Sequence, residues 1–333
     1  MIWLKAHNIA RYYLDITSEF AKEKDKYKDI AKRWIVIPEN MWKRLCLDEV
    51  DLWGQYYTIL SNVDKPNGII AILPWTKADP FIERIIKEIC KKLLDQVKET
   101  SSDMSRSMEK ILEVLFPKSD KITDRFHFMK EVLDDVQTVR KNLKIEFKKQ
   151  DNEARLKEKE MKKLWEKWVY EPRRSCMWET YLEIIHCCMY QCNIRRKDRN
   201  MMQVCRYKIM QWLSEFDELV ICIDLIQDLF STLDLAKDIN RKSMTTKAIK
   251  KFWSEALTKR LWKAKKVQDK CSVISAIIST TEIHFDGLTN YFISMHSTAY
   301  AEWLHSRIRE LIQNVRWFKN KDYMIYRILK MFS

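Results

Sequence analysis

The stretch 44-RLCLDEVDLWGQYYTILSNVDKPNGIIAILP-74 decides the fold, because it contains three strand-like runs joined by short turns. Apolar, β-branched and aromatic residues fill the runs at 44–50, 56–63 and 68–74, and polar turn residues separate them. Runs of this length bounded by turn residues are typical of strands, and short connections favour antiparallel neighbours. The sequence therefore predicts a three-stranded antiparallel meander.

Helix and strand patterns alternate in the residues that follow. Apolar residues at helical spacing predict helices over 79–97 and 104–115, and short strand patterns occur at 97–103 and 121–128. An antiparallel meander followed by alternating helices and parallel strands forms a mixed sheet covered by helices. This is the layout of the ribonuclease H-like fold, which we predict for this part of the chain.

The second half of the chain has the composition of a helical region. All six prolines and two of the three glycines precede residue 173, so few helix breakers follow it. Just before that point, helical spacing and a charged stretch at 148–163 predict an extended helix or a helical hairpin over 129–168. The predicted class is α/β plus all-α, a ribonuclease H-like mixed sheet with a large helical insertion before a C-terminal helix. The expected parts are a helical N-terminal extension at 1–43, the ribonuclease H-like core at 44–128, the insertion at 129–298 and C-terminal helices completing the core at 299–333.

The chain is strongly basic and lacks the sequence pattern of a membrane span. Lys and Arg number 61 against 47 Asp and Glu, which gives a net charge of +14 and favours a polyanionic partner. No apolar run approaches the about 18 residues that a span needs, and the N-terminus does not resemble a secretory signal. The nine cysteines are scattered and odd in number. We therefore expect a reducing, intracellular setting without a membrane.

Two aspartates occur at the ends of strands that neighbour each other in the predicted fold. Asp48 ends the first strand and Asp103 ends the fourth. Neighbouring carboxylates can share hard cations such as Mg²⁺. A pair of cations about 3.5–4 Å apart stabilises both the attacking and the leaving oxygen of phosphodiester exchange. Solvated aspartates are common at strand ends, so the pair by itself leaves a structural role open.

Short sequence motifs shared with a known family support a catalytic role for the two aspartates. They are Pro-Glu-Asn and Leu-Asp-Glu at 38–40 and 47–49, Tyr-Thr-Ile-Leu at 57–60, Thr-Asp-Arg-Phe-His at 123–127, and Ala-Glu at 301–302 before a basic helix. With the segments around them, the chain resembles the ISL-three family of bacterial insertion-sequence transposases. The likeness runs from about residue 27 to the C-terminus, and at 170–280 it is limited to a helical insertion of similar length.

The resemblance implies a DDE transposase, which performs DNA cleavage and strand transfer for an insertion sequence. By position, the family's catalytic and metal-binding acids fall on Asp48, Asp103 and Glu302, with Mg²⁺ or Mn²⁺ as the cofactor, in the form of two ions. Asp124 and His127 belong to the family's Asp-Arg-Phe-His word and are expected to orient a metal ligand or a DNA group. The alternatives are a structural, hydrogen-bonded His127 and a Glu302 that is merely solvated in a first helical turn.

The helix that carries the glutamate departs from the family pattern. Spacing places Glu302, His305 and Arg309 roughly along one helix face. The family usually has a small residue and an asparagine near the positions of Trp303 and His305, and its Ser-Asn-Gly turn is replaced by Leu-Trp-Gly at 52–54. Because all three acids are retained, we expect an intact metal site beside altered DNA contacts or backbone turns.

The expected partner is DNA, both the transposon ends and the target. The residues predicted to contact DNA phosphates are Arg307, Arg309, Arg316, Lys319 and Lys321. The family's usual N-terminal zinc-binding and helix-turn-helix region has no counterpart before Asp48, so end recognition is expected from a separate chain or an upstream segment. The resemblance also implies a homo-oligomer in the active complex and a nucleoid-associated location in the bacterial cytoplasm.

Other functions stay open at this point. The main rival is a catalytically inactive or designed basic helical DNA-binding protein on a transposase-like fold, which would hold DNA without cutting it. A weaker alternative is a structural helical protein whose charge only keeps it in solution. The cluster His186, Cys187, Cys188 and Cys192 could bind zinc, but no second spaced pair accompanies it, and buried thiols on an apolar helix are the favoured interpretation.

Overall fold

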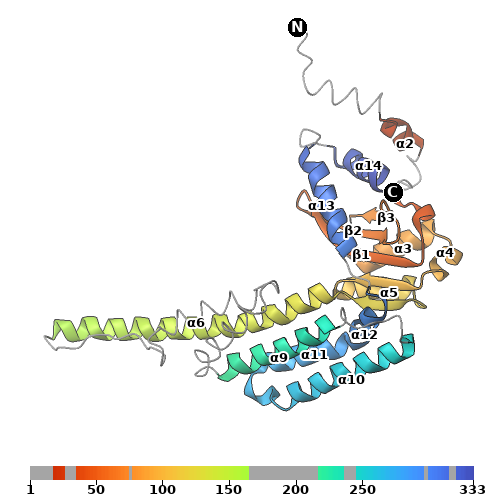
Figure 1. Ribbon diagram of the computed structural model, residues 1–333. Helices are drawn as coiled ribbons and strands as arrows, with labels where there is room; N and C mark the ends of the chain where they lie inside the picture. Colours follow the sequence, from red (N-terminus) through yellow and green to blue (C-terminus); the bar gives the residue numbers. More distant parts are fainter. Residues whose placement is uncertain are drawn as a thin grey trace, which may run out of the picture. The chain divides into compact units, whose positions relative to one another are not determined.

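Five strands form one mixed sheet in the computed structural model, in the order β3-β2-β1-β4-β5 (Figure 1). The first three strands pair antiparallel, and β4 and β5 extend the sheet in parallel from β1. This order confirms the predicted meander and the ribonuclease H-like class. The strands are β1 (Arg44–Leu52), β2 (Gln55–Asn62), β3 (Ile69–Leu73), β4 (Glu99–Ser102) and β5 (Asp120–Thr123).

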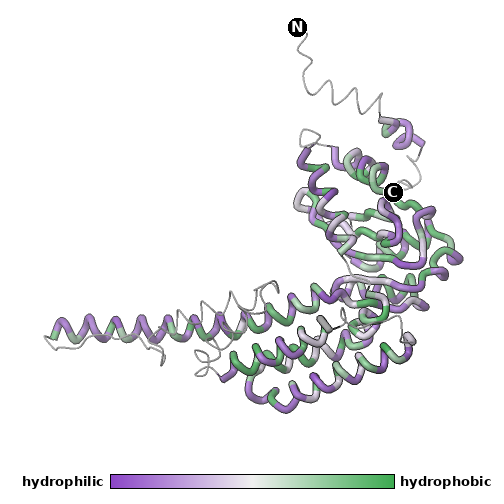
Figure 2. The backbone as a smooth tube through the Cα atoms, viewed as in Figure 1, coloured by the Kyte–Doolittle hydropathy of each residue, from purple (hydrophilic) through white to green (hydrophobic). Residues whose placement is uncertain are grey.

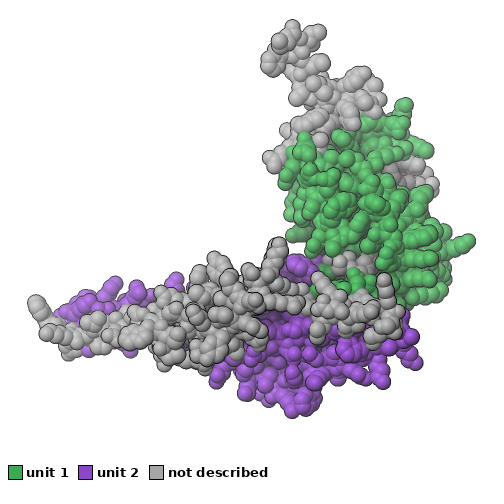
Figure 3. All heavy atoms as spheres, in the orientation of Figure 1, with its two compact units in different colours: residues 1–125, 286–333 green, residues 126–285 purple. Residues whose placement is uncertain are grey.

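The chain divides into two units, coloured separately in Figure 3. Unit 1 comprises residues 1–125 and 286–333, and unit 2 comprises residues 126–285. The predicted division into four parts stays a prediction. The structure describes residues 18–26, 35–74, 77–164, 217–235, 245–295, 299–314 and 320–333.

The β1–β2 hairpin closes through a two-residue turn with positive φ at both central residues. Trp53 has φ of 59° and Gly54 has φ of 71°. Turns of this kind suit the right-handed twist of paired strands. The antiparallel pairing runs to Leu52 opposite Gln55, whereas the parallel pairing with β4 ends at Leu47. The prediction that Asp48 ends its strand was therefore wrong, since the hairpin continues the strand beyond it.

Helices cover the sheet of unit 1, and one predicted helix is broken in two. The predicted helix at 79–97 forms as α3 (Ala78–Glu88) and α4 (Lys91–Asp95). Ile89 and Cys90 between them have extended backbone, with ψ of 124° and 148°. Ile89 is buried, and the break lets α4 lead directly into β4. The other helices of unit 1 are α2 (Phe20–Lys26), η3 (Pro38–Asn40), α5 (Arg106–Leu115), α12 (Phe285–Ser294), α13 (Ala299–Asn314) and α14 (Lys321–Phe332).

Strand β5 is shorter than predicted, because the chain turns into a helix directly after it. The predicted strand at 121–128 ends at Thr123, and α6 (Arg125–Lys163) follows. Strand pairing with β4 stops at Thr123, and after one further backbone hydrogen bond, from Asp124 to Ser102, the chain enters the helix. Phe128, Val132, Val136 and Val139 are buried at helical spacing. The first of the two predicted forms, one extended helix, is therefore confirmed for the described part of 129–168.

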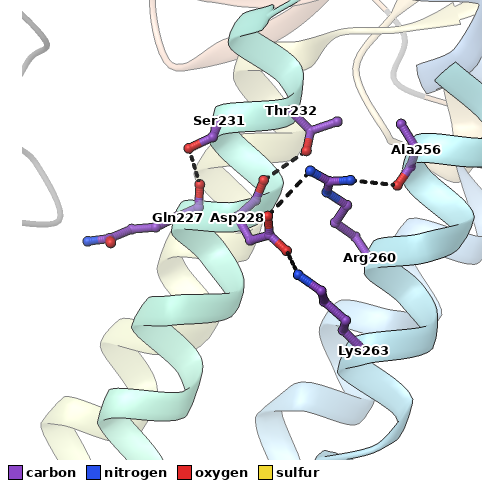
Figure 4. Close-up of polar contacts among 7 residues, drawn as sticks. All are labelled: Gln227, Asp228, Ser231, Thr232, Ala256, Arg260 and Lys263. Atoms are coloured by element: carbon purple, nitrogen blue, oxygen red, sulfur yellow. Dashed lines mark hydrogen bonds and ion pairs between the residues drawn. The ribbon is translucent and has the colours of Figure 1, made fainter. Parts of the chain in front are cut away.

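Unit 2 is helical throughout its described residues. Besides α6 it contains α9 (Asp217–Leu235), α10 (Thr246–Lys265), η5 (Gln268–Lys270) and α11 (Ser272–Ile283). Asp228 of α9 accepts from Lys263 at 3.0 Å and lies 3.4 Å from Arg260, so one carboxylate joins α9 to α10 (Figure 4). The predicted helical insertion is confirmed for the described residues within 173–298.

Figure 2 shows hydrophobic residues in the sheet and also along α9, whereas the C-terminal half of α6 is mostly hydrophilic. All five residues of β3 are buried, as expected for a strand covered on both faces. Among the described helices, none has the length and apolarity needed to cross a membrane.

Candidate active site

Asp48 and Asp103 meet where strands β1 and β4 separate. The last parallel pair of these strands is Leu47 with Ser102, and each aspartate is the next residue in its chain segment. Neighbouring strands lie about 5 Å apart, so the two backbone positions are adjacent. Local donors orient both carboxylates: Asp48 Oδ1 accepts from the backbone N–H of Glu49 at 2.8 Å, and Asp103 Oδ1 accepts from that of Ser105 at 2.9 Å.

Asp124 joins the same edge of the sheet, directly after β5. Its backbone N–H donates to the carbonyl of Ser102 at 3.3 Å, and its side chain is buried. The pKa of the buried Cys46 thiol shows that negative charge gathers at this edge. Burial raises the pKa of Cys46, and the negative charges of Asp48, Asp124 and Asp103 raise it further. The charges of three aspartates, one within β1 and one directly after each of β4 and β5, therefore act on the same buried thiol.

Glu49 is a further acid of this region that sequence reasoning left without a role. Burial raises the pKa of its carboxyl group, and the charge of Asp103 raises it further. The feature of the sequence that could have indicated a role for Glu49 is its position directly after Asp48, between two acids of the same strand. Glu49 and Asp103 thus lie close enough for each charge to disfavour the other.

His305 of α13 reaches Asp48 from outside the sheet. Its Nδ1 lies 3.6 Å from Asp48 Oδ2. Burial, followed by the charge of Arg309, lowers the pKa of His305 to about 4. The carboxylate of Asp48 would favour the charged imidazole, but removal from water outweighs it, so His305 is neutral near pH 7. Apolar residues of the same helix face, Leu304 and Ile308, are fully buried.

Glu302 lies on the exposed side of α13, one helical turn before His305. At 3.6 residues per turn, Glu302, His305 and Arg309 lie within about 60° of one another around α13. That face spans the border between the packed and the open side of the helix, since His305 is buried and the other two are exposed. Within the described ranges, no three or more His, Cys, Asp and Glu side chains are grouped closely enough to hold a metal ion. The fold places Asp48 beside Asp103 and puts Asp124 at the same edge of the sheet, while Glu302 lies on the exposed side of α13.

The donor set at the sheet edge suits a hard divalent cation. Carboxylate oxygens are the ligands that Mg²⁺ and Mn²⁺ prefer. His305 Nε2 is buried and has no hydrogen-bond partner in the part of the chain that the structure describes. Asp48 and Asp103 are the residues at this edge that could hold such a cation.

Three other predicted residues lie on described helices. Arg307 donates to Glu310 at 2.7 Å on the exposed face of α13, and Lys321 is the first residue of α14. His127 lies in the first turn of α6, with its ring 5.7 Å from that of Phe126. Outside the described residues lie Arg316, Lys319 and the zinc candidates His186, Cys187, Cys188 and Cys192.

The sheet order and the aspartates beside β1, β4 and β5 define a ribonuclease H-like protein. A family model described as a transposase, of the DDE type and the ISL-three group, matches residues 45–328. The chain therefore belongs to the ISL-three family of DDE transposases, enzymes of DNA transposition. No curated protein gives a significant match to the sequence. The family predicted from the sequence words is thus confirmed.

Proposed function

We propose that this chain cleaves DNA at the ends of an insertion sequence and joins it to target DNA, with Asp48, Asp103 and Glu302 as the metal-binding acids. The observation that carries the proposal is the register of β1 and β4, which brings Asp48 beside Asp103 in a sheet that lies within the transposase match. Ribonuclease H-like folds host several functions, so the family match is what directs the chemistry to DNA.

The proposed cofactor is Mg²⁺ or Mn²⁺, bound as two ions. When bound, such cations activate water and stabilise the attacking and leaving oxygens of a phosphodiester. The protein supplies oxygen donors that are already oriented, since the N–H groups of Glu49 and Ser105 fix Asp48 and Asp103. A site that is organised before substrate binds loses less free energy in reorganisation during the reaction.

Glu302 would complete the set of acids from α13. It is three residues before His305, which faces Asp48, and residues three apart on a helix are neighbours with Cβ atoms about 5–6 Å apart. Its exposed side chain is free to change rotamer without disturbing packed residues. Asp124 and His127 are proposed to orient a ligand or a DNA group, in keeping with the burial of Asp124 at the sheet edge.

DNA is the proposed partner, held through phosphate contacts. Arg309 and Lys321 are exposed cations of the described C-terminal helices, whereas Arg307 shares its charge with Glu310. A net charge of +14 supports salt-dependent binding to a polyanion. A homo-oligomer in the active complex remains part of the proposal.

The test is metal-dependent nicking of a plasmid that carries the terminal inverted repeats of an ISL-three insertion sequence. Asp48→Asn and Asp103→Asn should abolish nicking in Mg²⁺ or Mn²⁺ while DNA retention in a filter assay stays unchanged. Asp51→Asn is the matched control, because Asp51 is exposed on the same strand as Asp48. Wild-type nicking by either of the first two variants would show that the acids are wrongly assigned.

One observation favours a second function, DNA binding without turnover. Glu302 is exposed, and among the described residues no group of three acids is assembled for a metal. A catalytically inactive DNA-binding protein would retain the inverted repeats with strong salt dependence and leave them uncut at every metal concentration. The nicking assay on the unmodified chain separates the two functions.

A further inference from the structure

The side chain of His305 is buried against Asp48, and both of its ring nitrogens are polar atoms that need hydrogen-bond partners. Its exposed fraction is 7%, and that of the Asp48 side chain is 12%. Nδ1 lies 3.6 Å from Asp48 Oδ2, and Nε2 has no hydrogen-bond partner among the described residues. Burial of a polar group without full pairing is unfavourable, so this imidazole is not explained by packing alone.

We propose that His305 is a positioning residue, which holds the carboxylate of Asp48 in the orientation that binds the divalent cation. The inference rests on the proposed function, because it assumes that Asp48 is a metal ligand. It assigns to α13 a task apart from that of Glu302.

The tautomer of His305 follows from what it faces. An ionised carboxylate only accepts hydrogen bonds, so the ring nitrogen nearest to Asp48 must carry the proton to interact favourably. Nδ1–H then faces Oδ2 at 3.6 Å, an electrostatic contact longer than a hydrogen bond, while the N–H of Glu49 donates to Oδ1 at 2.8 Å. Positive partial charges opposite both oxygens favour one rotamer of the carboxyl group, and each oxygen keeps a lone pair for a cation.

The backbone around His305 makes the position of the ring well defined. Ala301, Leu304 and Ile308 of α13 are buried on the same side of the helix. The hydroxyl of Tyr300 also fixes the beginning of α13 to the turn between β2 and β3. A ring held by a packed helix can orient its partner more accurately than a ring on a loop.

The test measures the affinity of the full chain for MnCl₂ by titration calorimetry without DNA. His305→Asn retains an N–H donor near the place of Nδ1, whereas His305→Gln carries its amide farther out, near the place of Nε2. We expect Mn²⁺ affinity close to wild type for the Asn variant and about 10- to 100-fold weaker for the Gln variant, the range for loss of an outer-shell partner. Any other pattern overturns the proposal, including equal loss in both variants and retention by Gln alone, which would point to ligation through Nε2.

Two further measurements keep this test decisive. Asp48→Asn in the same titration checks the proposed function, because unchanged Mn²⁺ affinity there would remove Asp48 from the metal site whatever His305 does. If the His305 variants do not fold, ¹⁵N nuclear magnetic resonance of the unmodified protein reports the tautomer. A neutral ring protonated at Nδ1 is expected, and a ring protonated at Nε2 would overturn the inference.

Discussion

The backbone N–H of Gly68 donates to the hydroxyl oxygen of Tyr300 at 3.2 Å, which joins residues 232 positions apart. The same hydroxyl lies 3.0 Å from the carbonyl oxygen of Lys65 and 3.1 Å from that of Pro66. One phenol group thus ties the first turn of α13 to the turn between β2 and β3. This contact adds to the packing of Ala301, Leu304 and Ile308 in holding α13, and with it His305, against the sheet.

Tyr300→Phe should destabilise unit 1 by about 1–2 kcal/mol, because the variant leaves the Gly68 N–H and one carbonyl without their partner. The expected readout is a lower midpoint in urea unfolding together with faster hydrogen exchange at the Gly68 amide. Tyr56→Phe is the control, since Tyr56 is exposed on β2. Equal effects of the two substitutions would contradict a specific anchoring role for Tyr300.

Gly287→Ala should destabilise the docking of α12 on the edge of the sheet. An added Cβ would overlap Thr123 Oγ1 and lie 3.0 Å from the backbone nitrogen of Thr123. Alanine normally stabilises a helix interior relative to glycine by about 1 kcal/mol, so a loss of about 1–3 kcal/mol from overpacking reverses the usual sign. Thermal unfolding measures the change. Combination with Thr123→Ala should restore part of the loss, whereas simple additivity would argue against the clash.

The order of strands and helices could be predicted from the sequence, because local patterns determine it. The meander at 44–74 has both the apolar runs and the turns, and α5 (Arg106–Leu115) buries the predicted stripe. The ends of strands and helices could not be predicted where contacts between distant parts of the chain determine them. β5 ends where its partner β4 ends, and the helix predicted at 79–97 breaks at Ile89, where the chain must return to the sheet.

The candidate site could be predicted in part. The pairing of β1 with β4 places Asp48 beside Asp103, which strand order alone predicts once the fold is known. The side that each residue of α13 presents to the sheet was not predictable from spacing. Ala301, Leu304 and Ile308 define a buried stripe that includes His305 and leaves Glu302 outside it. The contact of His305 with Asp48 is a tertiary consequence of that packing.

Gly54→Ala should destabilise the β1–β2 hairpin through backbone conformation alone. Gly54 has φ of 71°, and an added Cβ would meet nothing within 4 Å. The left-handed region is unfavourable for L-residues by roughly 1–2 kcal/mol, so a loss of this size is expected. Chemical unfolding gives the value, with Gln55→Ala as the control on the exposed neighbouring residue. A loss no larger than that of the control would mean that the turn adopts another conformation.

The stability that His305 contributes should depend on pH between about 4 and 6.5. Its pKa in the folded chain is lowered from 6.5 to about 4 by burial. The unfolded chain therefore binds more protons in this window, so the contribution is fully present above pH 6.5 and is lost as pH falls toward 4. The difference between the pKa values in the unfolded and folded chain corresponds to roughly 3 kcal/mol in the free energy of unfolding. Unfolding free energies of the wild type and His305→Asn should converge or cross accordingly as pH falls, whereas a constant difference would mean an unperturbed histidine.

The last prediction concerns Glu302, whose exposed position makes its assignment the most demanding to test. Glu302→Gln keeps the size of the side chain and its helix propensity but removes the carboxylate charge. If Glu302 binds the metal, nicking should fall by more than the about 100-fold that loss of an outer-shell partner causes. DNA affinity should stay unchanged or rise slightly, because a negative charge near the phosphates is lost.

Glu310→Gln is the matched control for this substitution, since Glu310 is an exposed glutamate of the same helix, eight residues further along. It pairs with Arg307, so its loss should affect only salt-dependent DNA retention. A Mn²⁺ titration of both variants adds a readout independent of turnover, in which the Glu302 variant alone should bind more weakly. Nicking at the wild-type rate by Glu302→Gln would show that another residue is the third metal-binding acid. Glu49 would be examined first, because the charge of Asp103 raises the pKa of Glu49.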